Sequence, residues 1–409
     1  MSCRLCGARL SRCLVDLGAT PLANAYLTPE QAAAGADRAY PLRVMVCDHC
    51  LLVQVAESLP PDAIFAADYA YFSSFSASWV AHARRYAEAM TERFGLGPQS
   101  LVAEVASNDG YLLQHFRAAG IPVLGIEPAA GVAASARRIG VRTEQMFFAA
   151  DTAAGLAARY GRADLIAANN VLAHVPDLAG FVAGFTAMLR PEGVATFEFP
   201  HLLRLLQLVQ FDTIYHEHFS YLSLLVVEQA LRGAGLRAFD VERLPTHGGS
   251  LRVFACHTAA SHAPRPGLHQ VRADEAAAGL DRPETYNDFA PEVARICQSV
   301  RNFVTEQGRR GRVLAAYGAA AKGNTLLNTC GITARDVICV ADRNPAKQGK
   351  LLPGSHIPVV SPEALANARP ADVLVLPWNI ADEIAAELAP LHAAGTRLWV
   401  LVPEPRMLG

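Results

Sequence analysis

The chain has 409 residues and a formal net charge of -2, and 52% of its residues are hydrophobic while 18% are charged. This length is sufficient for two or three domains with large hydrophobic cores, and this composition excludes a disordered chain or a long coiled coil. Apolar runs stay shorter than the roughly 18 residues of a membrane-spanning helix, the first residues do not resemble a signal peptide, and the near-zero charge argues against a nucleic-acid binder.

Two closely spaced pairs of cysteines mark the N-terminal segment, in Cys3-Arg4-Leu5-Cys6 and Cys47-Asp48-His49-Cys50. Two such pairs can supply the four sulfur ligands of a tetrahedral zinc site, which leaves no open position and therefore indicates a structural metal. Redox dithiols or chance pairs are the alternative. The odd total of nine cysteines predicts a reducing compartment, the cytoplasm.

From Leu101 onward, short apolar strands alternate with helices. Strands are expected at Leu101–Ala106, Pro122–Ile126, Val141–Thr143, Asp164–Ala168 and Gly193–Phe199. Helices are expected at Ser78–Phe94, Gly110–Ala119, Gly131–Gly140 and Leu178–Leu189. This alternation predicts a parallel, doubly wound α/β sheet. The polar, proline-containing segment His262–Glu284 is predicted to be a linker.

Polar residues follow three of these strands, at the edge where doubly wound sheets bind ligands. The first strand runs into a small-residue turn that ends at Asp109 and Gly110, and Glu127 follows 18 residues after Asp109. An acid at about this spacing can accept both ribose hydroxyls of a nucleoside, although a solvated carboxylate is the alternative. Asn170 and His174 follow the fourth strand. These residues predict a nucleotide-like ligand.

The segment Phe211–Ser220 contains Tyr215, His216, Glu217 and His218 in succession. Histidine titrates near neutrality and can take a proton from a carbon beside a carbonyl group, while a neighbouring carboxylate can orient the imidazole. The residues alone leave open which histidine acts as the base. A polar surface loop or a zinc site are the alternatives, but the helix-spaced metalloprotease pattern is absent.

A second alternation follows a helix expected at Ala290–Gly308. Its strands are expected at Arg312–Tyr317, Asp336–Val340, Asp372–Leu376 and Leu398–Val402. The first of them leads into the small-residue turn Gly318–Thr325, and a helix N-terminus of this kind favours anions. The chain has three lysines, Lys322, Lys347 and Lys350, and all of them fall on or beside this edge. An NAD site and an inert support are the alternatives to a phosphate site.

Together, these motifs resemble the nucleotide-sugar C-methyltransferases, which have a class I S-adenosylmethionine-dependent core. The resemblance rests on the cysteine pairs, the strand-end turns, and the segments Asp68–Ser74, Tyr215–His218, Thr246–Ser250 and Tyr317–Lys322. It implies an α/β class I methyltransferase (Rossmann-like) core at residues 66–275. It also implies a small zinc-binding domain at residues 1–65 and a Rossmann-like nucleotide-sugar-binding domain at residues 276–409.

The resemblance also implies roles for single residues. For S-adenosylmethionine, Glu104, Asn108, Asp109 and Gly110 would hold the methionine part, Glu127 the ribose, Phe148 the adenine, and Asn170 would lie near the sulfonium. His218 would be the base, assisted by Glu217 and Tyr215, with Tyr71 beside them. The substrate would contact His174, His247, Lys322, Asn344 and Lys347, and the structural zinc would be held by Cys3, Cys6, Cys47 and Cys50. Packing or satisfied loop residues are the alternatives for Tyr71, His174 and His247, and exposed charge for Lys347.

The implied reaction methylates carbon 3 of a nucleotide-linked 4-keto deoxysugar, whose keto group acidifies the hydrogen on that carbon. Base-assisted enolate formation would precede methyl transfer. We keep a sugar O-methyltransferase, an NAD-dependent nucleotide-sugar dehydrogenase and a non-catalytic zinc-ribbon scaffold as alternatives. The expected partner is the nucleotide-sugar substrate, with no nucleic acid and no membrane, and the chain is expected to be a monomer.

Overall fold

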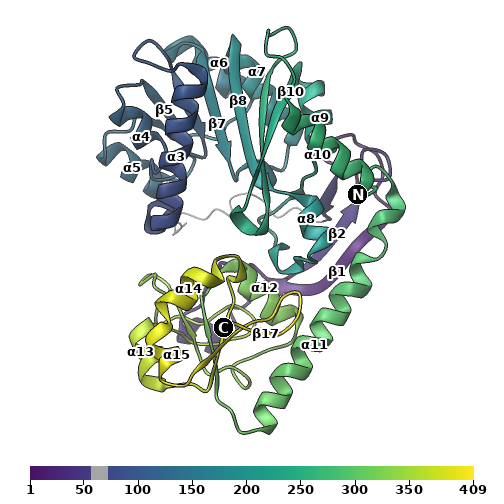
Figure 1. The fold of residues 1–409 in the computed structure, drawn as a ribbon, viewed down its shortest axis with the longest axis vertical. Helices are drawn as coiled ribbons and strands as arrows, with labels where there is room; N and C mark the ends of the chain where they lie inside the picture. Colours follow the sequence, from purple (N-terminus) through teal and green to yellow (C-terminus); the bar gives the residue numbers. More distant parts are fainter. Residues whose placement is uncertain (57–71) are drawn as a thin grey trace.

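The computed structural model describes residues 1–56 and 72–409, and the strands of these residues form three sheets. A seven-stranded sheet lies in the upper half of Figure 1 and a six-stranded sheet in the lower half, while β1 (Arg12–Pro21) and β2 (Ala39–Val46) run along one side between them. Among the described residues, no helix has both the length and the apolar character needed to cross a membrane.

The N-terminal sheet is antiparallel, and its strand order is β1-β2-β3-β9. β3 covers Val53–Val55 and β9 covers Ser220–Tyr221, and the short helix α1 (Pro29–Ala33) lies between β1 and β2 in sequence. β9 comes directly after the segment in which the sequence predicts catalytic residues. That segment is therefore joined to the N-terminal sheet by backbone pairing.

The central sheet confirms the predicted parallel, doubly wound arrangement. Its order is β10-β11-β8-β7-β4-β5-β6, in which the strands β4 to β8 are parallel. The parallel strands are β4 (Val102–Val105), β5 (Val123–Ile126), β6 (Thr143–Glu144), β7 (Ala163–Asn169) and β8 (Leu189–Pro200). β4 and β5 are buried at every position, because helices cover both faces of such a sheet.

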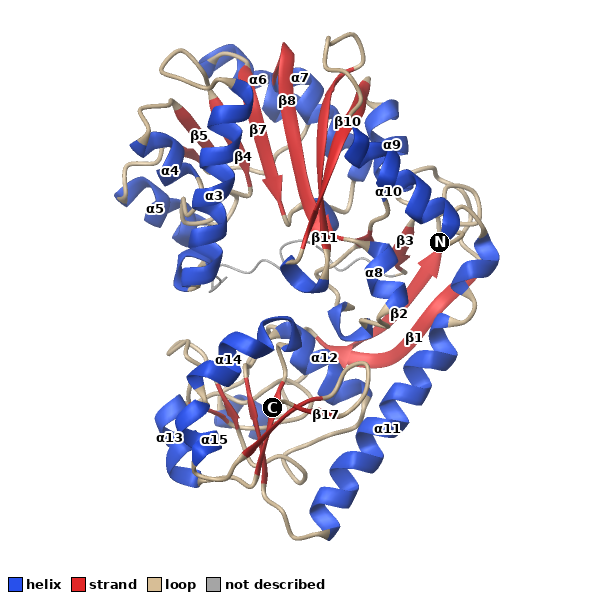
Figure 2. Ribbon diagram, viewed as in Figure 1, coloured by secondary structure: helices blue, strands red, loops and turns tan. Residues whose placement is uncertain are grey.

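Helices flank the central sheet, as Figure 2 shows. They are α3 (Ala77–Phe94), α4 (Leu113–Ala118), α5 (Ala130–Arg138), α6 (Ala150–Tyr160), α7 (Leu178–Met188) and α9 (Leu224–Gly233). The short helix α8 (Leu202–Gln207) lies beside the N-terminal sheet, and its Leu202 and Leu205 share a hydrophobic cluster with that sheet. The antiparallel pair β10 (Leu236–Leu244) and β11 (Ser250–His257) extends the sheet beyond β8. The sequence analysis did not predict this pair.

The predicted linker at His262–Glu284 is wrong over much of its length, since Pro266–Ala277 form the helix α10. Pro266 begins the helix at a position where no backbone N–H is needed. Leu268 and Val271, three residues apart, are buried, and the carboxylate of Glu275 accepts hydrogen bonds from His201 and from the first turn of α9. The polar residues that suggested a linker form the solvent face of a packed helix.

The C-terminal sheet has the order β14-β13-β12-β15-β16-β17, and only β17 is antiparallel to its neighbour. Its strands are β12 (Leu314–Tyr317), β13 (Val340–Ala341), β14 (Val359–Val360), β15 (Asp372–Val375), β16 (Arg397–Val400) and β17 (Arg406–Met407). Its helices are α11 (Phe289–Arg309), α12 (Ala321–Thr329), α13 (Pro362–Ala368), α14 (Ala381–Glu387) and α15 (Ala389–Ala393). The strand expected at Asp336–Val340 forms only from Val340, because the backbone N–H of Asp336 closes a turn onto Thr333.

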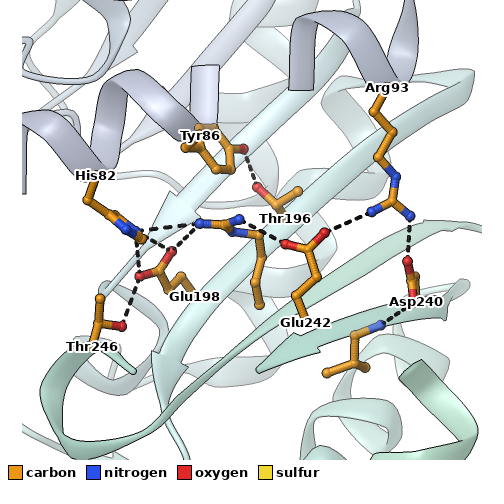
Figure 3. A network of polar contacts seen from close by, with 10 residues as sticks. His82, Tyr86, Arg93, Thr196, Glu198, Asp240, Glu242 and Thr246 are labelled. Atoms are coloured by element: carbon orange, nitrogen blue, oxygen red, sulfur yellow. Dashed lines mark hydrogen bonds and ion pairs between the residues drawn. The ribbon is translucent and has the colours of Figure 1, made fainter. Parts of the chain in front are cut away.

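A buried ion-pair network ties α3 to the strands at the edge of the central sheet (Figure 3). The carboxylate of Glu198, on β8, is fully buried and accepts hydrogen bonds from Arg252 (3.0 Å) and from His82 (3.1 Å). Arg252 also pairs with Glu242 at 2.9 Å, which in turn pairs with Arg93 of α3 at 3.1 Å. Burial raises the pKa of Glu198, but His82 and Arg252 outweigh it and hold this pKa below its ordinary value.

We expect Glu198→Gln to lower the thermal midpoint of unfolding by about 5 °C, because a neutral amide leaves the buried guanidinium of Arg252 partly uncompensated. Differential scanning fluorimetry measures this. Glu292→Gln is the matched control, since its partner Arg295 at 2.8 Å is solvent-exposed and such pairs contribute little. Equal midpoints for the two variants would contradict a stabilising role for the network.

Candidate active site at the junction of the three sheets

The four N-terminal cysteines lie together, as the sequence predicts. Their Sγ atoms are all within 4.8 Å of one another, with 3.5 Å between Cys3 and Cys50 and 3.5 Å between Cys6 and Cys47. Sulfur ligands about 2.3 Å from a zinc ion in a tetrahedral site lie slightly under 4 Å apart. The side chain of Gln54 donates to the Cys3 sulfur at 3.2 Å, which supports a thiolate there. The cluster thus fits a zinc ion with four sulfur ligands.

The turn after β4 has the tight backbone that the sequence suggests. Gly110 has a φ of +82°, and a Cβ atom at this position would lie 3.1 Å from Val141, so the turn favours glycine. Asn108 Oδ1 accepts from the backbone of Ser73, and Asp109 Oδ2 accepts from the backbone of Ser74. These bonds join the turn to the 3-10 helix η1 (Ser73–Phe75).

Acidic side chains lie at the carboxyl ends of β4 and β5. Glu104 is buried, its Oε2 has no hydrogen-bond partner among the described residues, and burial raises its pKa well above the ordinary value. Asp109 Oδ1 is also buried without a partner there. Glu127 accepts backbone hydrogen bonds from Asn108 (2.9 Å) and Ala129 (2.8 Å), and burial raises its pKa. Buried unpaired carboxylate oxygens fit a ligand that brings positive charge and hydrogen-bond donors.

Asn170 follows β7 at the same edge. Its φ is +55°, and both polar atoms of its side chain are buried without a partner among the described residues. The ring of Phe148 packs into the hydrophobic core, with its centroid 5.0 Å from that of Phe185 and 5.7 Å from that of Phe181. The neighbouring Phe147 is 61% exposed. The structure therefore brings Asn170 to this edge, and it packs the Phe148 ring against α7.

His218 is held by hydrogen bonds on both ring nitrogens. Its Nδ1 lies 2.9 Å from the carbonyl oxygen of Thr213, and its Nε2 lies 2.8 Å from the hydroxyl oxygen of Tyr215. A carbonyl only accepts, so Nδ1 carries the proton and Nε2 offers a lone pair to the Tyr215 hydroxyl. Burial, above all, lowers the pKa of His218 well below its ordinary value. The imidazole is therefore a neutral base at neutral pH.

The other histidine of this segment faces elsewhere. His216 Nε2 lies against the backbone carbonyls of Tyr40 and Pro41, at 3.3 and 3.2 Å, in the N-terminal sheet. Glu217 Oε1 accepts a hydrogen bond of 2.7 Å from Asn24, and burial raises the pKa of Glu217 to about 7. The geometry therefore favours His218 over His216 as the base.

Two further histidines stand near His218. The ring of His174 lies edge-on, with its centroid 4.7 Å from that of His218, and burial lowers the pKa of His174 to about 4. His247 has a φ of +54° in η4 (Thr246–Gly248), lies 5.4 Å from the Trp79 ring, and has a pKa lowered to about 4, chiefly by burial. The cluster thus contains neutral imidazoles.

Lys322 joins this cluster from the C-terminal sheet. Its Nζ donates to Asn379 Oδ1 at 2.5 Å and lies 4.7 Å from the centre of the Trp378 ring. Trp378 Nε1 donates to Asp212 Oδ2 at 2.6 Å, one residue before the carbonyl that holds His218. The carboxyl edges of the central and C-terminal sheets therefore meet at these side chains.

The other predicted substrate residues, Asn344 and Lys347, lie in the loop after β13. Lys347 Nζ donates to the carbonyl of Ala319 at 2.7 Å and pairs with Asp342 at 3.4 Å. Asn344 stabilises the local turn, because its backbone N–H donates to Asp342 and its side chain accepts from Ala346. The predicted Tyr71 lies outside the described residues.

Sequence reasoning missed several residues of the cluster: Asn24, Trp79, Asp212, Thr213, Trp378 and Asn379. Trp378 and Asn379 follow β15, so the rule that ligands bind at the carboxyl ends of parallel strands could have found them. Asp212 and Thr213 belong to the segment that the sequence pattern indicates. Asn24 and Trp79 reach the site through tertiary packing, for which the local sequence carries no signal.

Three family models match the chain. A C-methyltransferase C-terminal domain covers residues 245–403, a zinc binding domain covers residues 3–65, and a methyltransferase domain covers residues 79–241. The C-methyltransferase NovU of Streptomyces niveus is 38% identical over 406 residues, which cover 99% of this chain and 96% of that protein.

Two solved structures show weaker likeness. Magnesium protoporphyrin IX methyltransferase of Synechocystis PCC 6803 with bound S-adenosylhomocysteine has 16% identity and a TM-score of 0.35, over 44% of this chain and 83% of that one. The 1,6-didemethyltoxoflavin-N1-methyltransferase of Burkholderia thailandensis has 19% identity and a TM-score of 0.36, over 51% of this chain and 96% of that one.

The matched domains, the doubly wound sheet and the cysteine cluster define an S-adenosylmethionine-dependent methyltransferase with a zinc-binding domain. More narrowly, the chain belongs to the family of C-methyltransferases that includes NovU. This assignment sets aside the NAD-dependent dehydrogenase and the non-catalytic scaffold.

We expect Cys50→Ser to lose most of the roughly one zinc ion bound per chain, because three sulfurs hold the ion less tightly than four. Inductively coupled plasma mass spectrometry on the purified protein measures the metal. Cys13→Ser, at an exposed cysteine outside the cluster, should keep it. Unchanged zinc content in the Cys50 variant would rule out the proposed ligand set.

We expect Glu127→Gln to weaken binding of S-adenosylhomocysteine about tenfold, because a neutral amide is a poorer acceptor for ribose hydroxyls than a carboxylate. Isothermal titration calorimetry gives the dissociation constants. Glu144→Gln is the control: this acid ends β6 and is already paired with Arg159 at 3.2 Å. Equal weakening in both variants would argue against a specific contact by Glu127.

Proposed function

We propose that the protein transfers a methyl group from S-adenosylmethionine to carbon 3 of a nucleotide-linked 4-keto deoxysugar. The observation that carries the proposal is His218, a buried and neutral imidazole with a fixed tautomer, whose ring centroid lies 4.7 Å from that of His174, four residues after Asn170. Methylation of a weakly acidic carbon requires a methyl donor, here at the carboxyl edge of the central sheet, and a base close to it. The relative NovU is named a C-methyltransferase, which supports carbon as the acceptor.

In the proposed mechanism, His218 Nε2 removes the proton that the keto group acidifies. The Thr213 carbonyl accepts the Nδ1 proton, so it stabilises the imidazolium that forms and keeps the ring in place. Without substrate, the hydroxyl of Tyr215 is hydrogen-bonded to His218 Nε2. The approaching sugar carbon displaces this hydroxyl. We propose that the Tyr215 hydroxyl then donates to the sugar. We propose that Glu217, whose pKa burial raises to about 7, assists His218 in this step.

The bound S-adenosylmethionine supplies an electrophilic methyl group on a positively charged sulfur. We propose that Glu104, Asn108, Asp109 and Gly110 hold its amino-acid part and that Glu127 holds its ribose. Among the described residues, Glu104 Oε2 and Asp109 Oδ1 have no hydrogen-bond partner, which supports a cationic ligand at this place. The side-chain amide of Asn170 also has none there, which supports a contact near the sulfonium. Phe148 would flank adenine only after a change in its packing.

We propose that the sugar lies among His174, His247 and Tyr71, and that Asn344 and Lys347 contact the nucleoside diphosphate. Residues 1–65, 66–275 and 276–409 would be the three domains, with β9 of the second completing the sheet of the first. Reduced cysteine thiolates at a zinc site suit a cytoplasmic enzyme. We expect it to work as a monomer, without nucleic-acid or membrane partners.

A turnover screen tests this function. The protein is incubated with S-adenosylmethionine carrying a ¹³C methyl group and a panel of nucleotide 4-keto deoxysugars. We expect one nucleotide sugar to gain a single methyl group by mass spectrometry, and NMR should show that methyl on carbon 3. A methyl on oxygen would replace the proposal by a sugar O-methyltransferase, and no turnover with any 4-keto sugar would refute the substrate class.

We expect His218→Asn to slow methyl transfer by about 100-fold or more, because asparagine cannot accept the proton. The rate is followed by mass spectrometry at saturating substrate. His216→Asn, two positions away and packed on backbone carbonyls, should change the rate by less than about threefold, since it lies outside the proton path. Binding of S-adenosylhomocysteine checks that both variants are folded, and a fully active, folded His218 variant would remove it as the base.

A further inference from the structure

The helix that carries Lys322 packs directly on the segment that holds the base. Thr325, three residues after Lys322 on the same face of α12, donates from its Oγ1 to the carbonyl of Ile214 at 2.9 Å. Ile214 follows Thr213, whose carbonyl holds His218. Lys322 therefore projects from a helix that is fixed against the catalytic segment, and not from a separate nucleotide-binding surface.

The surrounding side chains fix the direction of the ammonium group. Asn379 accepts one hydrogen bond from Nζ, and the Trp378 ring lies 4.7 Å from Nζ. The Trp378 ring is held by the hydrogen bond from its Nε1 to Asp212 Oδ2, at 2.6 Å. It also packs closely on Gly248, where a Cβ atom would lie 2.4 Å from the ring. An ammonium has three N–H donors, and the described residues take up one of them. The remaining donors are available to a bound molecule.

The charge balance of the cluster supports a role for this cation. An enolate is negative, and His174, His218 and His247 are neutral, chiefly because burial lowers their pKa values. The charge of Lys322 adds to that lowering at His218 and His247. Burial raises the pKa of Asp212 to about 6, against the charge of Lys322, so this acid can balance Lys322 before substrate binds.

We infer that Lys322 is a catalytic residue whose ammonium donates a hydrogen bond to the sugar's keto oxygen as that oxygen becomes negative. The inference rests on the proposed function. The C3–H bond breaks and its proton goes to His218 Nε2, while the C–H electron pair forms a double bond to carbon 4 and the keto oxygen takes the negative charge. The enolate pair then forms the C3–methyl bond, the methyl–sulfur bond breaks with its electrons going to sulfur, and the keto group reforms. Lys322 stabilises the charge between these steps.

A contact to the diphosphate of the substrate is the competing role, since lysine also binds phosphate as a point charge. The two roles differ in what they affect. Stabilisation of a transient oxyanion changes kcat and the rate of enolate formation, whereas a phosphate contact changes KM and the affinity for the nucleoside diphosphate.

The experiment compares Lys322→Gln with the wild-type protein. Enolate formation is read as exchange of the carbon 3 hydrogen with deuterium from solvent, with S-adenosylhomocysteine present and no methyl donor. We expect kcat and exchange to fall about 100-fold or more, while KM and the dissociation constants of thymidine diphosphate and uridine diphosphate change less than about threefold. A rise of about tenfold in those dissociation constants with nearly unchanged exchange would assign Lys322 to the phosphates instead.

Two further variants make the result decisive. Lys350→Gln removes another of the three lysines and should leave the exchange rate unchanged. Lys322→Arg keeps the charge and should retain at least about a tenth of the exchange rate, so it decides the question if the glutamine variant does not bind S-adenosylhomocysteine. Equal loss in the arginine and glutamine variants, with that binding intact, would contradict a role for the charge. Absence of exchange in the wild-type protein would overturn the proposed function and this inference together.

Discussion

The segment from Phe211 to Tyr221 is held from three sides, and the site depends on this constraint. The C-terminal sheet contributes the hydrogen bond from Thr325 to Ile214, and the N-terminal sheet contributes the pairing of β3 with β9. The central sheet contributes the bridge between His201 and Leu222, just after β8. A histidine in an ordinary surface loop would lack these restraints. Here His218 keeps one position because three sheets share the segment that carries it.

The zinc-binding domain also helps to hold the segment that carries His218. The Cys47–Cys50 turn leads into β3, and β3 pairs with β9 directly after His218 and Phe219. The guanidinium of Arg4, which lies between Cys3 and Cys6, also donates to the carbonyl of Phe219 at 3.3 Å. A metal that holds the cysteines therefore also orders the backbone beside His218.

Local sequence patterns predicted those parts of the structure that local interactions determine. The five parallel strands of the central sheet, the cysteine cluster and the acids at the strand ends all follow from periodicity and spacing. The helix α10 was missed because its polar face resembles a linker, and its burial depends on contacts with α9 that are distant in sequence.

Local sequence patterns also do not predict where Lys322 lies relative to the rest of the site. The turn after β12 predicts an anion-binding edge, which is a property of one sheet alone. The structure turns this edge toward the segment that carries His218, so the charge of Lys322 lowers the pKa values of His218 and His247 in addition to burial. The relative placement of two sheets is set by packing between residues more than a hundred positions apart, such as Thr325 on Ile214. No motif in the sequence encodes it.

The central claim is that a neutral, buried His218 removes a proton from carbon 3 of a keto sugar. The most direct measurement is solvent deuterium exchange at that carbon, with the wild-type protein, S-adenosylhomocysteine and a nucleotide 4-keto deoxysugar that the protein methylates. The account predicts incorporation of deuterium at carbon 3 when no methyl donor is present. Methylation of the same sugar without any exchange at carbon 3 would contradict it.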